Sequence, residues 1–202
     1  MKKLDLLMIN MFKINAIKFG NFKMKSGLMT PVYIDLRVLV SSPKVLKEIA
    51  HEYVAILNKL SFKRMVGLPY TALPIVANIA AINNKPWIYI RKEVKEYGTK
   101  KAIEGAYNVG EKVVMIDDMI TNGLSKVETL KPLEENGLKI KDIVVLVDRE
   151  QGGKGHLEKK GYTFHSVFTL AQWLKVLMEH KKITKDKYAE VIAYLDANKI
   201  KL

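Results

Sequence analysis

The stretch VVMIDDMITNG, residues 113–123, leads from an apolar run into a polar turn. Its first four residues are apolar, Asp117 and Asp118 follow side by side, and a Thr-Asn-Gly turn comes two residues later. A single Asp after a strand is usually only a turn or cap residue. Two adjacent carboxylates before a flexible turn are less ordinary, and they indicate a binding site at the end of a buried strand.

Similar apolar runs alternate along the chain with segments of helical periodicity. Strands are predicted over 65–68, 86–91, 112–117, 142–148 and 163–168, and helices over 43–60, 71–83, 123–136, 170–181 and 184–197. Continuous apolar strands between helices are typical of an α/β protein whose parallel sheet is covered on both faces. Such folds bind ligands beyond the carboxyl ends of the strands, which is where the Asp pair is predicted to lie.

The composition limits the classes of protein that this chain can belong to. A chain of 202 residues with 49% hydrophobic residues can bury one sizeable core. It has no cysteine, which excludes disulfides and thiolate metal sites. No run of 18 apolar residues occurs, so we expect no membrane span and a soluble cytoplasmic protein.

The net charge of +13 allows three interpretations. The simplest is a lysine-rich solvated surface, and the next is a small polyphosphate substrate. Nucleic acid is the least favoured partner, because no aromatic-basic stacking motif appears. Residues 111–150 are an exception to the basic character, with 9 acidic and 6 basic side chains around the Asp pair.

The chemistry of the 117–123 stretch suits a phosphorylated sugar. Glycine and small polar residues at the start of a helix leave backbone N–H groups free to hold a phosphate. Carboxylates just before them can accept hydrogen bonds from sugar hydroxyls or meet a hydrated Mg²⁺ ion. The chain has no GxGxxG after a strand and no GxxxxGK[ST], so neither a dinucleotide site nor a P-loop is supported.

Residues 113–123 resemble the phosphoribosyl-pyrophosphate (PRPP) motif of the type I phosphoribosyltransferases. Four further stretches resemble the orotate phosphoribosyltransferases in order and spacing: FGNFKMKSGLMTPVYIDLR (19–37), GLPYTALP (67–74), RKEVKEYGTKKAIEG (91–105) and VDREQGG (147–153). The resemblance extends over about residues 10–195 and is closest to the orotate domain of bifunctional UMP synthases.

This resemblance implies the type I phosphoribosyltransferase fold, a mostly parallel central sheet flanked by helices. A single domain over 1–202 is expected, with an N-terminal hood (1–40), a PRPP-binding core (41–170) and C-terminal helices (171–202). A mobile lid loop is expected within 91–105, for which an exposed loop or hairpin of ordinary charges is the alternative. We expect no decarboxylase domain in this chain.

The reaction implied by the resemblance is transfer of a 5-phosphoribosyl group from PRPP to orotate, with Mg²⁺ as cofactor. The catalytic residues implied are Arg91, Lys92, Lys95, Asp117 and Asp118. The PRPP site implied also contains Lys25, Tyr70, Thr71, Tyr97, Met119, Ile120, Thr121, Asn122, Gly123, Leu124 and Ser125. The orotate site implied contains Lys25, Tyr33, Ile34, Thr121 and Arg149.

Individual roles follow from the same resemblance. Asp117 and Asp118 bind the ribose hydroxyls, the 119–125 loop binds the 5′-phosphate, and Lys95 stabilises the leaving diphosphate. Arg149 clamps the orotate carboxylate, although a salt bridge with a neighbouring acid is the alternative. Mg²⁺ is held mainly by PRPP, with an Asp of the pair reached through water rather than as a direct ligand.

The partners implied are orotate, PRPP, a second copy of the chain and a separate orotidine 5′-monophosphate decarboxylase. In the expected homodimer, lid lysines serve the partner subunit's site. Two other functions stay open: a transferase for another base, and a PRPP-sensing regulator that binds nucleic acid without catalysis. The KSG and DREQGG stretches argue against the first, and the lid cations Arg91, Lys92 and Lys95 argue against the second.

Overall fold

The structure is a computed structural model that describes residues 2–23, 27, 29–91 and 102–199. A six-stranded sheet forms its centre, in the order β5, β4, β3, β6, β7, β8. All neighbours are parallel except β4 and β5. The strands are β3 (Arg64–Gly67), β4 (Trp87–Ile90), β5 (Ile103–Glu104), β6 (Lys112–Ile120), β7 (Lys139–Asp148) and β8 (Thr163–Thr169).

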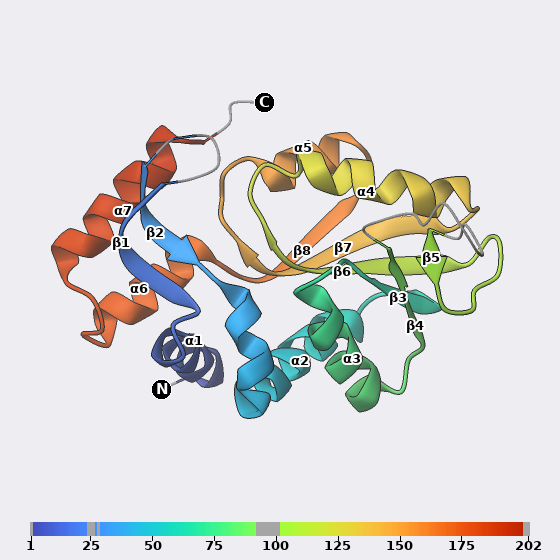
Figure 1. Cartoon of the computed structure of the whole chain (residues 1–202), viewed down its shortest axis with the longest axis horizontal. Helices are drawn as coiled ribbons and strands as arrows, with labels where there is room; N and C mark the ends of the chain where they lie inside the picture. The colour runs from blue at the N-terminus through green and yellow to red at the C-terminus, as the bar shows by residue number, and fades with distance from the viewer. Residues whose placement is uncertain (1, 24–26, 28, 92–101, 200–202) are drawn as a thin grey trace.

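Helices cover both faces of this sheet (Figure 1). One face packs against α2 (Pro43–Leu57) and α3 (Ala72–Asn83), and the other against α4 (Leu124–Glu135) and α5 (Gly153–Lys159). Successive residues of β6 enter two separate cores, Val114 on the side of α2 and Met115 on the side of α4. Burial on both faces explains why the strands are continuous apolar runs, and it confirms the predicted α/β class.

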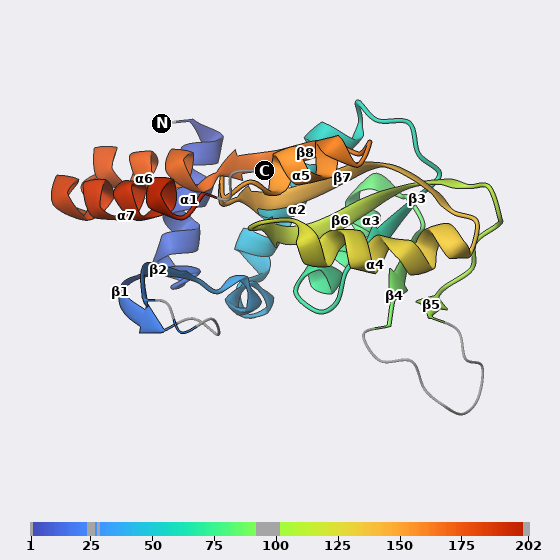
Figure 2. The ribbon, with the colours of Figure 1, turned by 90° about the horizontal axis from the view of Figure 1, so that it is seen from above.

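A second group of elements lies at one end of the sheet (Figures 1 and 2). It contains α1 (Lys3–Lys13), the antiparallel pair β1 (Ile17–Lys23) and β2 (Met29–Ile34), the short 3₁₀ helix η1 (Leu36–Ser41), α6 (Leu170–Glu179) and α7 (Lys185–Ala197). Because α6 starts directly after β8, this group lies beyond the carboxyl ends of the parallel strands. Trp173 of α6 is fully buried and donates its indole N–H to the carbonyl of Met8 over 2.9 Å.

The predicted strands and helices are present, with shifted ends. The prediction that the central strand ends at 117 was wrong, because β6 continues to Ile120 and pairs Met119 with Val147 of β7. The sequence analysis missed α1, β1, β2, β5 and α5. Pairing with the long strand β7 therefore draws the Asp pair into the sheet itself rather than into the turn.

No helix within the described ranges is long and apolar enough to cross a membrane. The hood, core and C-terminal helices do not have separate interiors. One buried cluster joins Leu7 of α1, Ile49 of α2, Val144 of β7 and Leu195 of α7. The division of the chain at 40 and 170 stays a prediction.

Candidate active site

Asp117 and Asp118 point to opposite faces of the sheet, as successive residues of a strand do. Asp117 is 5% exposed and faces α4, where it pairs with Lys126. Asp118 faces α3 and bonds the side chain of Thr71, the residue before that helix. The two carboxylates therefore reach different surroundings from adjacent positions of β6.

Each carboxylate also accepts a main-chain hydrogen bond. One oxygen of Asp117 accepts from the N–H of Asp118, and one oxygen of Asp118 accepts from Met119, both over 2.8 Å. Burial raises the pKa of Asp118, while the bonds to Met119 and Thr71 oppose that rise. These bonds hold both groups in fixed orientations at the carboxyl end of β6.

The turn after β6 leads directly into α4. Gly123 adopts a φ of 75°, a conformation that favours glycine, and α4 begins at the next residue. The side chain of Asn122 accepts the N–H of Leu124 over 3.1 Å. This bond uses one of the backbone donors that we expected to be free for a phosphate, so the remaining donors lie earlier and later in the turn.

The loop after β7 packs against this turn. Arg149 N–H donates to the carbonyl of Ile120 over 3.1 Å, and Gly153 N–H donates to that of Thr121 over 3.0 Å. A Cβ atom at Gly153 would lie 2.6 Å from the side chain of Ile120 and 2.8 Å from the carbonyl oxygen of Thr121. The proposed phosphate turn and the loop that carries Arg149 are thus fixed against each other.

Arg149 is a half-buried cation without a matching anion among the described residues. Its Nε is buried and has no hydrogen-bond partner there. The neighbouring acids are used elsewhere: Asp148 accepts the N–H of Glu150, and Glu150 accepts the N–H of Ala171. Burial lowers the pKa of Arg149, and the nearby Tyr194 opposes that shift. The salt bridge that we considered as an alternative role is not formed in this part of the chain.

A cavity of about 520 Å³ lies beside the Asp pair, between the ends of β3, β4 and β6 and the side of α4. Leu68 and Pro69 line it from the loop after β3, and Arg91 lines it from the end of β4. The guanidinium of Arg91 pairs with Glu104 across the β4–β5 ribbon. The cavity therefore joins three of the predicted motifs at one edge of the sheet.

Lys126 is a cavity residue that the sequence analysis missed. It lies in the first turn of α4, and its ammonium group forms an ion pair with Asp117. Burial lowers the pKa of Lys126 to about 8. One signal in the sequence could have identified Lys126. It lies three residues after Gly123, on a helix that begins at the site, and residues at this spacing share one face of a helix.

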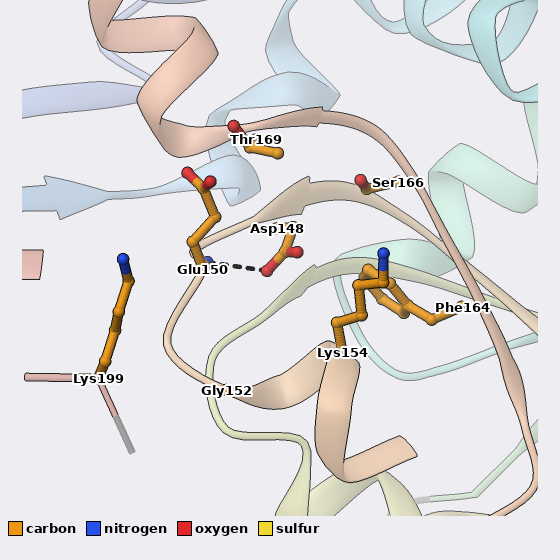
Figure 3. A pocket seen from close by; sticks show the side chains of 8 residues that line it. All are labelled: Asp148, Glu150, Gly152, Lys154, Phe164, Ser166, Thr169 and Lys199. Carbon is orange, nitrogen blue, oxygen red and sulfur yellow. Dashed lines mark hydrogen bonds between the residues drawn. The ribbon is translucent and has the colours of Figure 1, made fainter. Parts of the chain in front are cut away.

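A second cavity of about 430 Å³ lies at the carboxyl ends of β7 and β8 (Figure 3). Asp148, Glu150 and Thr169 line it, together with the amino groups of Lys154 and Lys199. Figure 3 shows the Glu150 side chain extending from the loop toward Thr169. Burial raises the pKa of Asp148. This cavity borders the Arg149 loop and is separate from the one beside Asp117.

The remaining predicted residues have varied surroundings. Tyr33 on β2 is 38% exposed and its hydroxyl accepts from Arg37 over 3.0 Å, whereas the neighbouring Ile34 is only 7% exposed and belongs to the core. Tyr70 is 63% exposed and follows Pro69 through a cis peptide bond. Tyr33 and Tyr70 are exposed enough to contact a ligand directly, while Ile34 packs into the core beneath β2.

Some predicted residues are not covered by the description. Lys25, Lys92, Lys95 and Tyr97 lie outside the described residues, as does the side chain of Ser125. The roles implied for them, and the lid as a whole, stay predictions.

The chain is similar to proteins of one kind over most of its length, although no family model matches it. It is 41% identical to uridine 5′-monophosphate synthase of Bos taurus over 95% of this chain and 40% of that protein. It is 37% identical to orotate phosphoribosyltransferase of Caenorhabditis elegans, over 92% of this chain and 83% of that protein.

The fold agrees with a solved structure of the same kind. UMP synthase of Leishmania donovani superposes with a TM-score of 0.88 at 42% sequence identity, covering 96% of this chain and 42% of that one. The chain thus spans about two fifths of the length of the two synthases that it matches.

Proposed function

Because the chain belongs to the orotate phosphoribosyltransferase family, we propose that it transfers the 5-phosphoribosyl group of PRPP to orotate. The products are orotidine 5′-monophosphate and diphosphate, on the route to UMP. One observation carries this proposal: the loop after β7, which carries Arg149, packs against the turn that follows the Asp pair at the carboxyl end of β6.

The mechanism follows from the charges that develop as the bond at ribose C1 breaks. Positive charge grows on the sugar and negative charge on the departing diphosphate. Asp118 binds a ribose hydroxyl, the turn and the start of α4 hold the 5′-phosphate, and Arg149 orients the orotate carboxylate. Fixed groups of this kind lower the barrier mainly by positioning and by electrostatic preorganisation.

Orotate reacts as an anionic nucleophile in this proposal, and no strong general base is required. The unpaired Nε of Arg149 supports the assignment, since a half-buried guanidinium with no acidic partner among the described residues is suited to a planar carboxylate ligand. Tyr33, exposed on β2 and packed at a tilt against Phe22 with ring centroids 5.4 Å apart, supplies an aromatic surface for the base.

Mg²⁺ is proposed as the cofactor, carried into the site by PRPP. Within the described residues no three His, Asp or Glu side chains gather to hold a metal, so this part of the chain offers no complete cage of its own. This suits Mg²⁺, which commonly uses one or two carboxylates together with substrate phosphates. Asp117 and Asp118 are the residues that would reach the bound ion through water, and the ion would neutralise charge on the diphosphate.

We also propose a homodimer in which Lys95 of the lid acts in the partner subunit's site. Mixing a Lys95→Ala variant with an Asp118→Asn variant tests this arrangement. Hybrid dimers should regain activity, because each would contain one site with both groups intact. A mixture that stays inactive after subunit exchange has been confirmed would contradict lid sharing.

A separate orotidine 5′-monophosphate decarboxylase is a proposed partner. UMP lacks the carboxyl group that orotate brings into the nucleotide, so a decarboxylation must follow the transfer. This chain covers only 40% of the bovine UMP synthase, so that relative is more than twice as long as this chain. Co-purification with the decarboxylase from the same source is the test.

The experiment for the transfer itself follows the loss of orotate by its ultraviolet absorbance, with PRPP and Mg²⁺ present. Uracil, adenine, hypoxanthine and nicotinate are compared as alternative bases, and EDTA is the metal control. Magnesium-dependent consumption of orotate alone is expected. PRPP binding without turnover of any base, combined with salt-dependent DNA binding, would instead favour a regulator.

A further inference from the structure

The ammonium group of Lys126 is held at the wall of the cavity beside β6. Its partner is one carboxylate oxygen of Asp117, and the other oxygen of that group accepts the N–H of Asp118. The side chain of Lys126 is 15% exposed and that of Asp117 is 7% exposed. Both charges are therefore largely removed from water, and the pair has little freedom to rearrange.

The ion pair leaves donors of Lys126 unused. An ammonium group has three N–H donors, and Asp117 is the one partner of Lys126 among the residues that the structure describes. A buried charge with incomplete hydrogen bonding is costly. An anionic group that enters the cavity and accepts the unused N–H donors of Lys126 would therefore bind favourably. Lys126 lines the cavity and its side chain is little exposed, so we take its unused donors to face the cavity.

The charges around the cavity make this cation important. The described residues that line it include two cations, Arg91 and Lys126, and three carboxylates, Asp117, Asp118 and Glu128. Arg91 is already paired with Glu104. Without Lys126, a phosphate entering the cavity would meet three carboxylates and one neutralised arginine.

We propose that Lys126 is a PRPP-contacting residue, fixed by Asp117 so that it donates to the diphosphate group of the substrate. The diphosphate is the part of PRPP concerned, because the proposed function places the 5′-phosphate at the 121–123 turn and Asp118 at the ribose, which leaves the diphosphate as the anionic group for the cavity beside Asp117. Asp117 then has two tasks, orienting Lys126 and meeting the ribose. This inference rests on the proposed function and adds a residue to the same site.

The first test replaces Lys126 by Met, which keeps the length of the side chain and removes its charge. Calorimetry with PRPP and Mg²⁺ should show binding weakened by about tenfold to a hundredfold, the usual effect of losing a hydrogen bond to a charged group. Inorganic diphosphate should lose affinity similarly, ribose 5-phosphate should not, and the KM for orotate should stay constant. Lys126→Arg should recover most of the PRPP affinity.

Lys131→Met is the matched control, since Lys131 lies exposed on the same helix and outside the cavity. It should bind PRPP as the unchanged protein does. A folded Lys126→Met variant with unaltered affinity for PRPP and diphosphate would overturn the inference. A loss of affinity confined to ribose 5-phosphate would also overturn it. An equal loss of affinity for PRPP and orotate that Lys126→Arg fails to rescue would indicate a structural role and would overturn it too.

A second variant covers the case in which Lys126→Met leaves Asp117 unpaired and fails to fold. The double variant Asp117→Asn/Lys126→Met removes both charges, and it should bind diphosphate more weakly than Asp117→Asn alone. Equal binding by the two would refute the role of Lys126. Failure of the proposed function is a distinct result, because the unchanged protein would then neither bind PRPP nor consume orotate.

Discussion

The hydroxyl group of Tyr53 donates a hydrogen bond to the main-chain carbonyl of Asp117 over a distance of 2.6 Å. Tyr53 belongs to α2 and is fully buried, so the bond passes through the core from a helix to the carboxyl end of the central strand. Burial raises the pKa of Tyr53, as does the charge of Asp118. The hydroxyl therefore keeps its proton and acts as a permanent donor that anchors the Asp pair.

Replacing Tyr53 by Phe should destabilise the fold and weaken the site together. The variant leaves the buried Asp117 carbonyl without this donor, which typically costs about 1–3 kcal/mol. Urea denaturation should show a lower midpoint, and the KM for PRPP should rise. Tyr162→Phe is the control, because the Tyr162 hydroxyl donates to Glu134 at the surface and its loss should change stability little. Equal midpoints for the two variants would contradict the anchoring role.

Asp118→Asn should impair catalysis much more than folding. The substitution keeps the shape of the side chain but removes the charge that faces the ribose, and loss of one preorganised group typically costs about 10²–10³-fold in rate. Steady-state kinetics with varied PRPP should show this fall in kcat/KM. The thermal unfolding midpoint should not fall, since burial raises the pKa of Asp118 and its negative charge therefore does not favour the folded state. Asp186→Asn, at an exposed position of α7, is the control. If Asp118→Asn keeps activity close to that of the unchanged protein, the ribose contact is excluded.

Arg149→Lys should act on orotate and spare PRPP. Lysine keeps the positive charge but lacks the planar fork that binds a carboxylate through two parallel hydrogen bonds. We expect the KM for orotate to rise by about tenfold or more, the scale of one lost charged hydrogen bond. PRPP affinity measured by calorimetry is the internal control. If PRPP affinity falls and the orotate KM is constant, the carboxylate clamp is wrongly assigned.

Gly153→Ala should disturb the turn that is proposed to hold the 5′-phosphate. The added Cβ would clash with Ile120 and with the carbonyl oxygen of Thr121. Overpacking of this kind costs about 1–3 kcal/mol. Both the unfolding midpoint and the affinity for ribose 5-phosphate should fall, whereas Lys154→Ala, at the next and exposed position, should leave both unchanged. Unaltered binding by Gly153→Ala would show that the turn does not depend on this contact.

The pair formed by Glu111 and Arg64 should make stability depend on pH in the acid range. Hydrogen bonds from Arg64 and then Asn108 lower the pKa of Glu111 to about 2, from an ordinary value of 4.5. A carboxylate with a lowered pKa stabilises the fold above its unfolded-state pKa, and this contribution disappears as pH falls toward the folded-state value.

Glu111→Gln should therefore unfold at lower urea concentration than the unchanged protein at pH 7. The difference should shrink as pH is lowered from about 5 toward 2. Denaturation series at pH 7, 5 and 3 measure it. A gap of constant size across the series would mean that packing, and not the charge of Glu111, is responsible.

Much of the fold could be predicted from residue patterns alone. The apolar run 113–116 is continuous because β6 is buried on both faces, and that pattern indicated a parallel sheet. The hood strands β1 and β2 were missed because their burial is irregular and polar residues interrupt them. The end of β6 was misplaced because its last pairs depend on β7, which is distant in sequence.

Residue order and composition were enough to predict the α/β class, the Asp pair near the end of the central strand, and the identity of the motifs that form the site. These features depend on local patterns of burial and on residue type. Tertiary packing was needed to establish that Asp117 and Asp118 face opposite sides of the sheet, that Arg149 is half-buried with no acidic partner among the described residues, and that Lys126 meets Asp117. Each of these features depends on which helices and strands pack together. That packing decides which charged groups are removed from water and which of them find a partner.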